Sequence, residues 1–222
     1  MLAVLSSKDK KVAELKKRGL SYRSFRKGLS MVAMYPVGLL AKPGYREEDG
    51  EESRILDYLG IDLVEMAREG KLDPVIGRES EIEQLINILS RRKKNNPLIV
   101  GEAGVGKTVL VEGLAQRIAD GKVPSSLKDM EIVLLDVAGI VAGSKMRGDI
   151  EEKVMSIVQD VISGNNTILF IDEINNIISP GDLLGSSSDI ASVLKPALLQ
   201  DEFRCIGAIT TEDYSSTFES DN

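Results

Sequence analysis

A glycine-rich stretch that ends in lysine and threonine carries the clearest chemistry in this 222-residue sequence. It matches the pattern G-x-x-x-x-G-K-[ST] at Gly101, Glu102, Ala103, Gly104, Val105, Gly106, Lys107 and Thr108. In this pattern the glycines turn backbone N–H groups toward phosphate oxygens, the lysine reaches the outer phosphates and the hydroxyl binds Mg²⁺. We therefore predict a phosphate site, with Lys107 on the phosphates and Thr108 on the metal. The alternative is a glycine-rich turn that serves packing alone.

Two adjacent carboxylates, Asp172 and Glu173, follow an apolar run later in the chain. Two adjacent acidic residues rarely end a buried strand unless they bind another group or have a function. We predict that Asp172 completes the Mg²⁺ shell and that Glu173 orients and polarises the water that attacks the phosphate. The alternative is that both acids merely begin the next loop.

The composition limits catalysis to groups of this kind. The sequence has no histidine, no tryptophan and one cysteine, Cys205. It therefore has no serine–histidine–aspartate triad, no histidine or cysteine zinc site and no intrachain disulfide. Carboxylates, lysine, hydroxyls and backbone amides remain, and among them Glu173 is the predicted base. A single thiol also fits a reducing, cytoplasmic compartment.

The distribution of charge along the sequence indicates which kinds of partner the protein can bind. The net charge of −7 argues against broad nucleic-acid binding, although residues 8–27 hold nine basic and two acidic side chains. We interpret these basic residues as the solvated face of a short helix, with an anionic partner as the alternative. The uncharged runs of the sequence, such as residues 29–41, are all shorter than the roughly 18–20 residues that span a bilayer. We expect neither a membrane anchor nor a nucleic-acid partner.

A scaffold of alternating strands and helices must position these motifs. Near-continuous apolar runs predict four strands buried on both faces, at 98–100, 132–135, 167–171 and 205–209. Helices are predicted at 107–120, 150–163 and 189–200. This alternation predicts an α/β fold, a parallel sheet with helices on both faces, whose ligands bind at the carboxyl ends of the strands.

Thr210 ends the strand that we expect between the two motif strands. A hydroxyl at that position suits a group that senses the γ-phosphate. The alternative is that Thr210 simply caps the following turn.

The N-terminal part of the chain lacks this alternation of predicted strands and helices. A helix is predicted at 8–18, followed by a stretch rich in proline, glycine and acidic residues, and then by helices at 55–69 and 79–92. We therefore divide the chain into a helical segment at 1–30, a linker at 31–54 and a nucleotide-binding domain at 55–222.

Several further motifs accompany the phosphate loop in a consistent order. They are D-P-V-I-G-R at 73–78, R-R-K-K-N-N-P at 91–97, V-E-G-L-A at 111–115, I-D-E at 171–173 and K-P-A-L at 195–198. Together they resemble the first ATPase module of the Clp-type AAA+ unfoldases, the ClpA/ClpB/ClpC group, whose module has a P-loop large subdomain. Residues 1–30 resemble the end of the N-terminal domain of that group.

The resemblance assigns roles to residues of this sequence. It implies that Val75 and Ile76 line an adenine pocket, that Lys107 and Thr108 hold ATP and Mg²⁺, that Glu173 drives hydrolysis and that Thr210 is the sensor. It also places a pore loop for protein substrates at Lys145, Met146 and Arg147.

The sequence departs from the family in three places. Met146 stands where the pore loop has tyrosine, and Asn175 stands where histidine usually follows the acidic pair. The sequence given also ends at Asn222, before the family's paired-arginine segment, last strand and helical lid. We therefore expect the strand at 98–100 to be an exposed edge, and ATP binding to survive better than turnover.

The resulting functional hypothesis is an ATP-binding module of a Clp-type unfoldase, which couples ATP hydrolysis to protein remodelling in a ring. Its expected partners are protein substrates, other copies in a homo-hexamer or Clp subunits, and a protease ring. The alternative is a hydrolysis-poor, ATP-gated binding protein that associates with Clp partners. A GTPase is disfavoured because the guanine motif N-K-x-D does not occur.

Overall fold

The structure of the chain is a computed structural model that describes residues 54–142, 147–164, 166–178 and 186–216. The predicted segment at 1–30 and nearly all of the predicted linker at 31–54 lie outside the described residues. The same is true of Lys145 and Met146 in the predicted pore loop, whereas Arg147 begins a helix. The described residues therefore cover most of the predicted nucleotide-binding domain.

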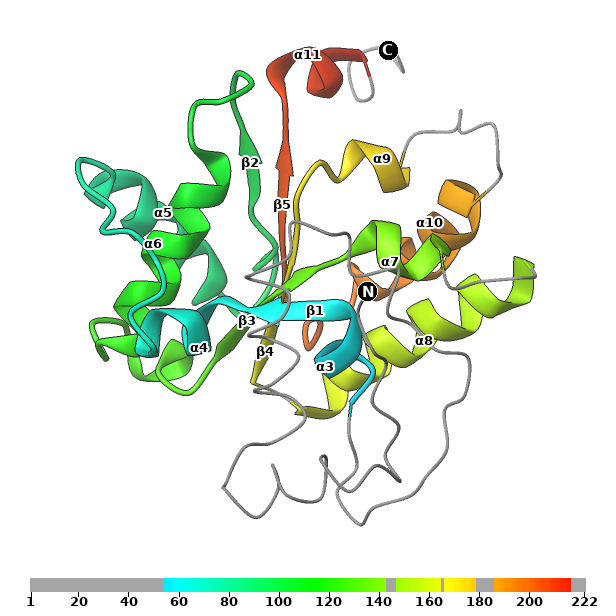
Figure 1. The fold of residues 1–222 in the computed structure, drawn as a ribbon, viewed down its shortest axis with the longest axis horizontal. Coiled ribbons are helices and arrows are strands. Elements are labelled where there is room, and N and C mark those ends of the chain that lie inside the picture. The colour runs from blue at the N-terminus through cyan, green and yellow to red at the C-terminus, as the bar shows by residue number, and fades with distance from the viewer. Residues whose placement is uncertain (1–53, 143–146, 165, 179–185, 217–222) are drawn as a thin grey trace, which may run out of the picture.

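Five strands form one mostly parallel sheet at the centre of the fold (Figure 1). In chain order they are β1 Gly60–Asp62, β2 Leu98–Val100, β3 Glu131–Leu135, β4 Thr167–Ile171 and β5 Cys205–Ile209. Their order across the sheet is β1-β3-β4-β5-β2, and β1 alone among them pairs antiparallel. The four strands expected from the apolar runs are thus confirmed, and β5 lies between the two motif strands as predicted.

β2 is an edge of this sheet among the described strands, which agrees with the expectation for residues 98–100. Leu98 and Val100 are 39% and 43% exposed. The central strands β4 and β5 are instead buried along their whole length, which explains their continuous apolar runs.

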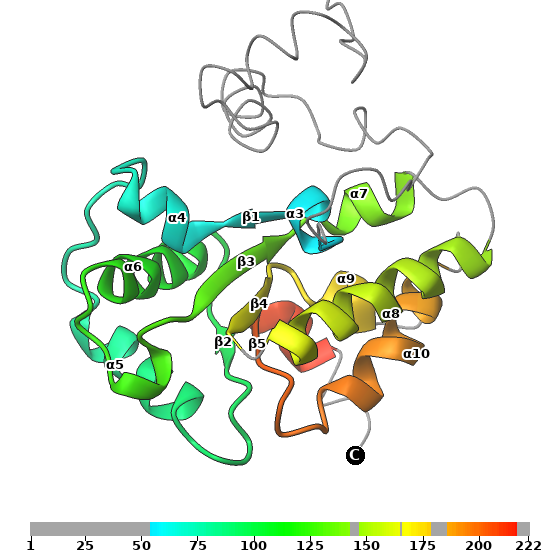
Figure 2. The ribbon, with the colours of Figure 1, turned by 90° about the horizontal axis from the view of Figure 1, so that it is seen from below.

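Helices cover both faces of the sheet, as predicted (Figure 2). One face carries α4 Leu63–Arg68, α5 Glu79–Leu89, α6 Lys107–Ala119 and the short 3₁₀ turn Ser125–Leu127. The other carries α3 Leu56–Leu59, α7 Val137–Ala142, α8 Arg147–Gly164, α9 Asn175–Ile178 and α10 Ser186–Ala197. A last short helix, α11 Thr211–Tyr214, follows β5. Each face of the sheet has its own apolar core, so the predicted α/β class is confirmed.

The predicted single helix at 55–69 is wrong, because β1 interrupts it between α3 and α4. The buried leucines of this stretch have a helical spacing, which concealed the break. Gly60 has extended backbone angles, and a Cβ there would clash with Val133 of the neighbouring strand. The side chain of Asp62 then accepts hydrogen bonds from the N–H groups of Val64 and Glu65 and starts α4. Glycine and aspartate therefore mark a strand that periodicity alone did not reveal.

Two asparagines fix the loop that leads into β2. The Asn95 amide donates to the carbonyl of Asp201 at 3.1 Å. The Asn96 amide donates to the carbonyl of Leu198 at 3.2 Å and its oxygen accepts from the N–H of Cys205 at 2.8 Å. Side-chain amides thus satisfy backbone groups where the chain turns from α10 into β5. These bonds tie the segment before β2 to the turn after α10 and to the first residue of β5.

We predict that Asn96→Ala lowers the free energy of unfolding by about 1–3 kcal/mol, because it leaves a buried backbone donor and an acceptor unpaired. Urea denaturation measures the change. Gln200→Ala in the neighbouring loop is the control, since exposed Gln200 should change stability by less than about 0.5 kcal/mol. An Asn96→Ala protein as stable as this control would contradict the prediction.

Candidate nucleotide site

The predicted site residues meet at one edge of the sheet. β2 runs into the loop at 101–106, β5 into Thr210 and β4 into Asp172. These three strands are adjacent and parallel, so their carboxyl ends lie side by side, at the upper end of the sheet in Figure 1. Strand order therefore brings together groups that are more than a hundred residues apart in the chain.

The backbone of the phosphate loop has the conformation that its glycines permit. Gly104 and Gly106 have φ values of 76° and 89°, in the left-handed region that side chains disfavour. Gly106 is also the N-cap of α6, so the loop opens directly onto the first turn of a thirteen-residue helix. Free N–H groups at a helix N-terminus favour an anion.

The ammonium group of Lys107 is held within the loop itself. Its Nζ donates to the carbonyl oxygens of Gly101 and Glu102, each at 2.9 Å. These neutral acceptors can be exchanged for phosphate oxygens, which form stronger, charge-assisted bonds with an ammonium group. The lysine is thus already within the loop that would surround the phosphates.

Thr108 and Asp172 are in direct contact across the site. The Thr108 hydroxyl donates to Asp172 Oδ2 at 2.7 Å, and Asp172 Oδ1 accepts from the N–H of Glu173 at 3.0 Å. A hydroxyl and a carboxylate are hard oxygen donors of the kind that Mg²⁺ prefers. The pair predicted for the metal therefore lies together and fits a Mg²⁺ ion chemically.

Glu173 adopts an unusual backbone conformation at the end of β4. Its φ is 50°, one of two positive values among the non-glycine residues described. Its side chain is exposed, and Oε2 accepts a hydrogen bond from the amide of Asn176 at 3.1 Å. The sequence reasoning assigned no role to Asn176, which lies three residues after the predicted base.

Thr210 forms the cap that was the alternative to a sensor. Its oxygen accepts from the N–H of Asp213 at 3.0 Å, and its hydroxyl donates to Asp213 Oδ2 at 2.6 Å. It is therefore the N-cap of α11. The sensor role remains a prediction, and it requires the hydroxyl to exchange Asp213 for a phosphate oxygen.

Val75 and Ile76 have different surroundings. Val75 packs against α6 at Gly113, where a Cβ would lie 3.2 Å from its Cγ1. Ile76 is 84% exposed, so its side chain is available to a ligand. The amide of Gln116 on α6 also donates to the carbonyl of Asp73 at 2.6 Å. The turn at 73–78 is thus anchored on the helix that begins at the phosphate loop.

Arg78 reaches the phosphate loop, although the sequence reasoning gave it no role. Its Nη2 donates to the carbonyl oxygen of Val105 at 2.8 Å, and its Nη1 pairs with Glu81 at 3.0 Å. The signal available in the sequence was its place at the end of the motif at 73–78.

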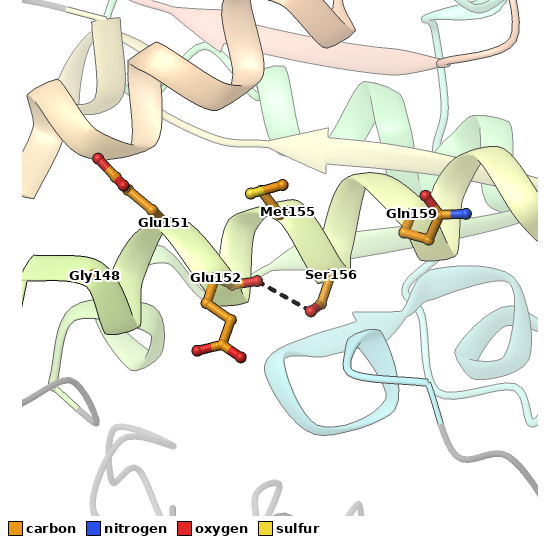
Figure 3. A pocket seen from close by; sticks show the side chains of 6 residues that line it. All are labelled: Gly148, Glu151, Glu152, Met155, Ser156 and Gln159. Atoms are coloured by element: carbon orange, nitrogen blue, oxygen red, sulfur yellow. Dashed lines mark hydrogen bonds between the residues drawn. The ribbon is translucent and has the colours of Figure 1, made fainter.

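An open hollow of about 490 Å³ lies elsewhere, along α8. Figure 3 shows the six residues that line it, Gly148, Glu151, Glu152, Met155, Ser156 and Gln159, along this helix. The Ser156 hydroxyl donates to the carbonyl of Glu152 within the helix, and Met155 is 62% exposed. None of these residues belongs to the predicted nucleotide site.

The chain belongs to the ATPase family associated with various cellular activities (AAA), which matches residues 97–217. Within this family it is a Clp-type module, which confirms the resemblance drawn from the motifs. Chaperone protein ClpB 1 of Synechocystis is 50% identical over 173 residues, which cover 77% of this chain and 19% of that protein. Chaperone protein ClpB of Aquifex aeolicus is 51% identical over 171 residues, 77% of this chain and 17% of that protein.

Solved structures give the same assignment. A cryo-electron microscopy reconstruction of Hsp104 in a closed state with ATPγS and FITC casein has a TM-score of 0.68 and 43% identity. An extended Saccharomyces cerevisiae Hsp104:casein complex has a TM-score of 0.67 and 44% identity. Each covers 76% of this chain, which covers 28% of the solved chain. The chain thus spans about a fifth of the curated relatives and just over a quarter of Hsp104.

Among the residues that the structure describes, no helix is both long enough and apolar enough to cross a bilayer.

We predict that Glu112→Gln, on α6 and near Asp73, stabilises the protein in a pH-dependent way. Desolvation, and secondly the charge of Asp73, raise the pKa of Glu112. A raised pKa in the folded state means that the folded protein binds more protons, so wild-type stability falls as pH rises through this pKa. The variant should match wild type below about pH 4 and become the more stable protein toward pH 7.

Urea denaturation at several pH values checks this prediction. Gln200→Ala, at an exposed position without a titratable side chain, is the control, and its stability difference from wild type should not vary with pH. A stability difference for Glu112→Gln that stays constant with pH, or that falls, would contradict the assignment.

Proposed function

We propose that this chain is the ATP-binding part of a ring-forming Clp-type unfoldase, which uses ATP hydrolysis to remodel proteins. The contact between Thr108 and Asp172, at the mouth of a phosphate loop, is the observation that supports the proposal most directly. It joins two motifs that are 64 residues apart into one candidate Mg²⁺ site. The bound ligand would be ATP with Mg²⁺, in line with the nucleotides named with the Hsp104 structures.

Different residues of the candidate site would bind the nucleotide and promote its hydrolysis. Lys107 would exchange the carbonyls of the loop for phosphate oxygens, and the N–H groups of the loop would hold the same phosphates. Thr108 and Asp172 would hold Mg²⁺, which neutralises charge on the phosphates during transfer. Glu173 would accept a hydrogen bond from the attacking water and orient it.

We also propose a state of assembly and a class of substrate for the protein. Clp relatives and casein-bound Hsp104 structures support a homo-hexameric or mixed Clp ring that handles protein substrates in the cytoplasm, with a protease ring as a further partner. Lys145, Met146 and Arg147 would face the substrate. Met146 would grip through a flexible thioether instead of an aromatic ring.

A hydrolysis-poor, ATP-gated binding protein is the second candidate. One observation favours it: the two side chains proposed for hydrolysis are both occupied by neighbours. The Thr210 hydroxyl donates to Asp213, and the Glu173 carboxylate accepts from Asn176. Binding requires no change at either group, whereas a sensor role requires the Thr210 hydroxyl to exchange Asp213 for a phosphate oxygen.

We predict that Lys107→Ala weakens Mg²⁺–ATP binding by about 10- to 100-fold, the effect of losing charge-assisted hydrogen bonds to phosphate. Isothermal titration calorimetry measures it. Glu173→Gln serves as the matched control, because it removes the proposed base and should leave affinity nearly unchanged. Equal affinities of wild type and Lys107→Ala would contradict the phosphate site.

Turnover and assembly separate the two candidate functions. An arginine supplied in trans contributes roughly 10³–10⁵ to phosphoryl transfer in known cases. We therefore expect the isolated monomeric chain to hydrolyse ATP far below about 1 s⁻¹. ATP-dependent hexamers in size-exclusion chromatography, with faster turnover that Glu173→Gln abolishes, would support the unfoldase. A monomer that binds ATP and a Clp subunit would support the binding protein.

A further inference from the structure

Arg78 connects the turn before α5 to the phosphate loop through one arm of its guanidinium, and its other arm is held by a residue of α5. One arm donates to the carbonyl oxygen of Val105 at 2.8 Å, and the other pairs with Glu81 at 3.0 Å. Hydrogen bonds from Ser80 and Arg78 lower the pKa of Glu81, so Glu81 stays ionised and keeps the guanidinium in place. Arg78 does not lie in the glycine-rich pattern itself.

The bond to Val105 fixes a whole peptide plane. The peptide that joins Val105 to Gly106 is planar and trans, because the structure has no cis peptide among its described residues. In a trans peptide the carbonyl and the following N–H point in opposite directions. When Arg78 holds the Val105 oxygen on its own side of the loop, the Gly106 N–H must point to the other side.

Gly106 lies where the orientation of a backbone N–H group affects the binding of an anion. It is the left-handed N-cap of α6 and directly precedes Lys107. A left-handed residue flanked by turn residues directs successive N–H groups into a concave anion-binding nest. Without the Arg78 bond this peptide plane could rotate, because glycine permits a wide range of backbone angles.

The backbone around Arg78 is itself well anchored. Gly77 has a φ of 75°, and its N–H donates to Glu79 Oε1 at 3.3 Å. Val75 packs on Gly113 of α6, and Asp73 accepts from Gln116 of the same helix. Arg78 thus projects from a turn that is fixed to the helix following the phosphate loop.

We propose that Arg78 is a positioning residue for the phosphate site: it holds the Val105 carbonyl outward so that the Gly106 N–H faces the bound phosphates. The proposal rests on the proposed nucleotide-binding function. It assigns the effect to the phosphates alone, since Arg78 would act on the loop and not on the nucleoside.

The affinities for Mg²⁺–ATP and for inorganic tripolyphosphate, which has no nucleoside, test whether Arg78 acts on phosphate binding alone. We expect Arg78→Gln to weaken binding of Mg²⁺–ATP and of inorganic tripolyphosphate by the same factor, about tenfold, measured by calorimetry. Arg78→Lys should recover part of the loss, because an ammonium group can still donate one bond to Val105. Weaker ATP binding with unchanged tripolyphosphate binding would overturn the proposal.

Arg117→Gln is the matched control. Arg117 on α6 pairs with Glu83 on α5, so this variant also removes an arginine–glutamate pair that involves α5, without touching the loop. Both affinities should remain at the wild-type value. A loss equal to that of Arg78→Gln would show that loss of an arginine–glutamate pair at α5, and not of the bond to the Val105 carbonyl, lowers the affinity.

A ligand-free measurement separates this proposal from the proposed function. The residual dipolar coupling of the Gly106 N–H reports the orientation of that bond in solution. We expect it to change in Arg78→Gln while the couplings along α6 keep their wild-type values. An unchanged Gly106 coupling would overturn the role of Arg78. Failure of the wild-type chain to bind ATP or tripolyphosphate would instead overturn the proposed function.

Discussion

The hydrogen bond between Thr108 and Asp172 joins the two motifs of the candidate nucleotide site. It exists because β4, β5 and β2 are parallel neighbours, so the residues that follow each strand meet at one edge of the sheet. Burial of β4 and β5 on both faces keeps that edge rigid, because a shift of either strand would disturb two apolar cores. The chemistry of the site is therefore set by the order of strands.

The polar side chains of the candidate site are hydrogen-bonded within the site, close to where a nucleotide would bind. Lys107 donates to two carbonyls of the loop, Thr108 donates to Asp172, and Thr210 donates to Asp213. A phosphate oxygen could replace the acceptor in the Lys107 and Thr210 bonds, and a metal ion bound by both Thr108 and Asp172 could replace the hydrogen bond between them. Nucleotide binding would thus exchange existing hydrogen bonds, and the cost of ordering side chains would be small.

Sequence reasoning located the parts of this site that depend on local patterns. The phosphate loop, the acid pair and four strands follow from residue type and apolar runs, so their places were predictable. The β1 strand was missed because its neighbours have a helical spacing, and only contact with Val133 excludes a side chain at Gly60. The bond from Arg78 to Val105 was also missed, because it joins residues 27 apart whose proximity depends on how α5 packs on α6.

A crystal structure with Mg²⁺ and a non-hydrolysable ATP analogue would test the proposed nucleotide site. We expect Lys107 Nζ to leave the carbonyls of Gly101 and Glu102 for the phosphates. We also expect Mg²⁺ to take the place of the hydrogen bond between Thr108 and Asp172. A nucleotide bound elsewhere, or bound while that hydrogen bond remains intact, would contradict the proposed site.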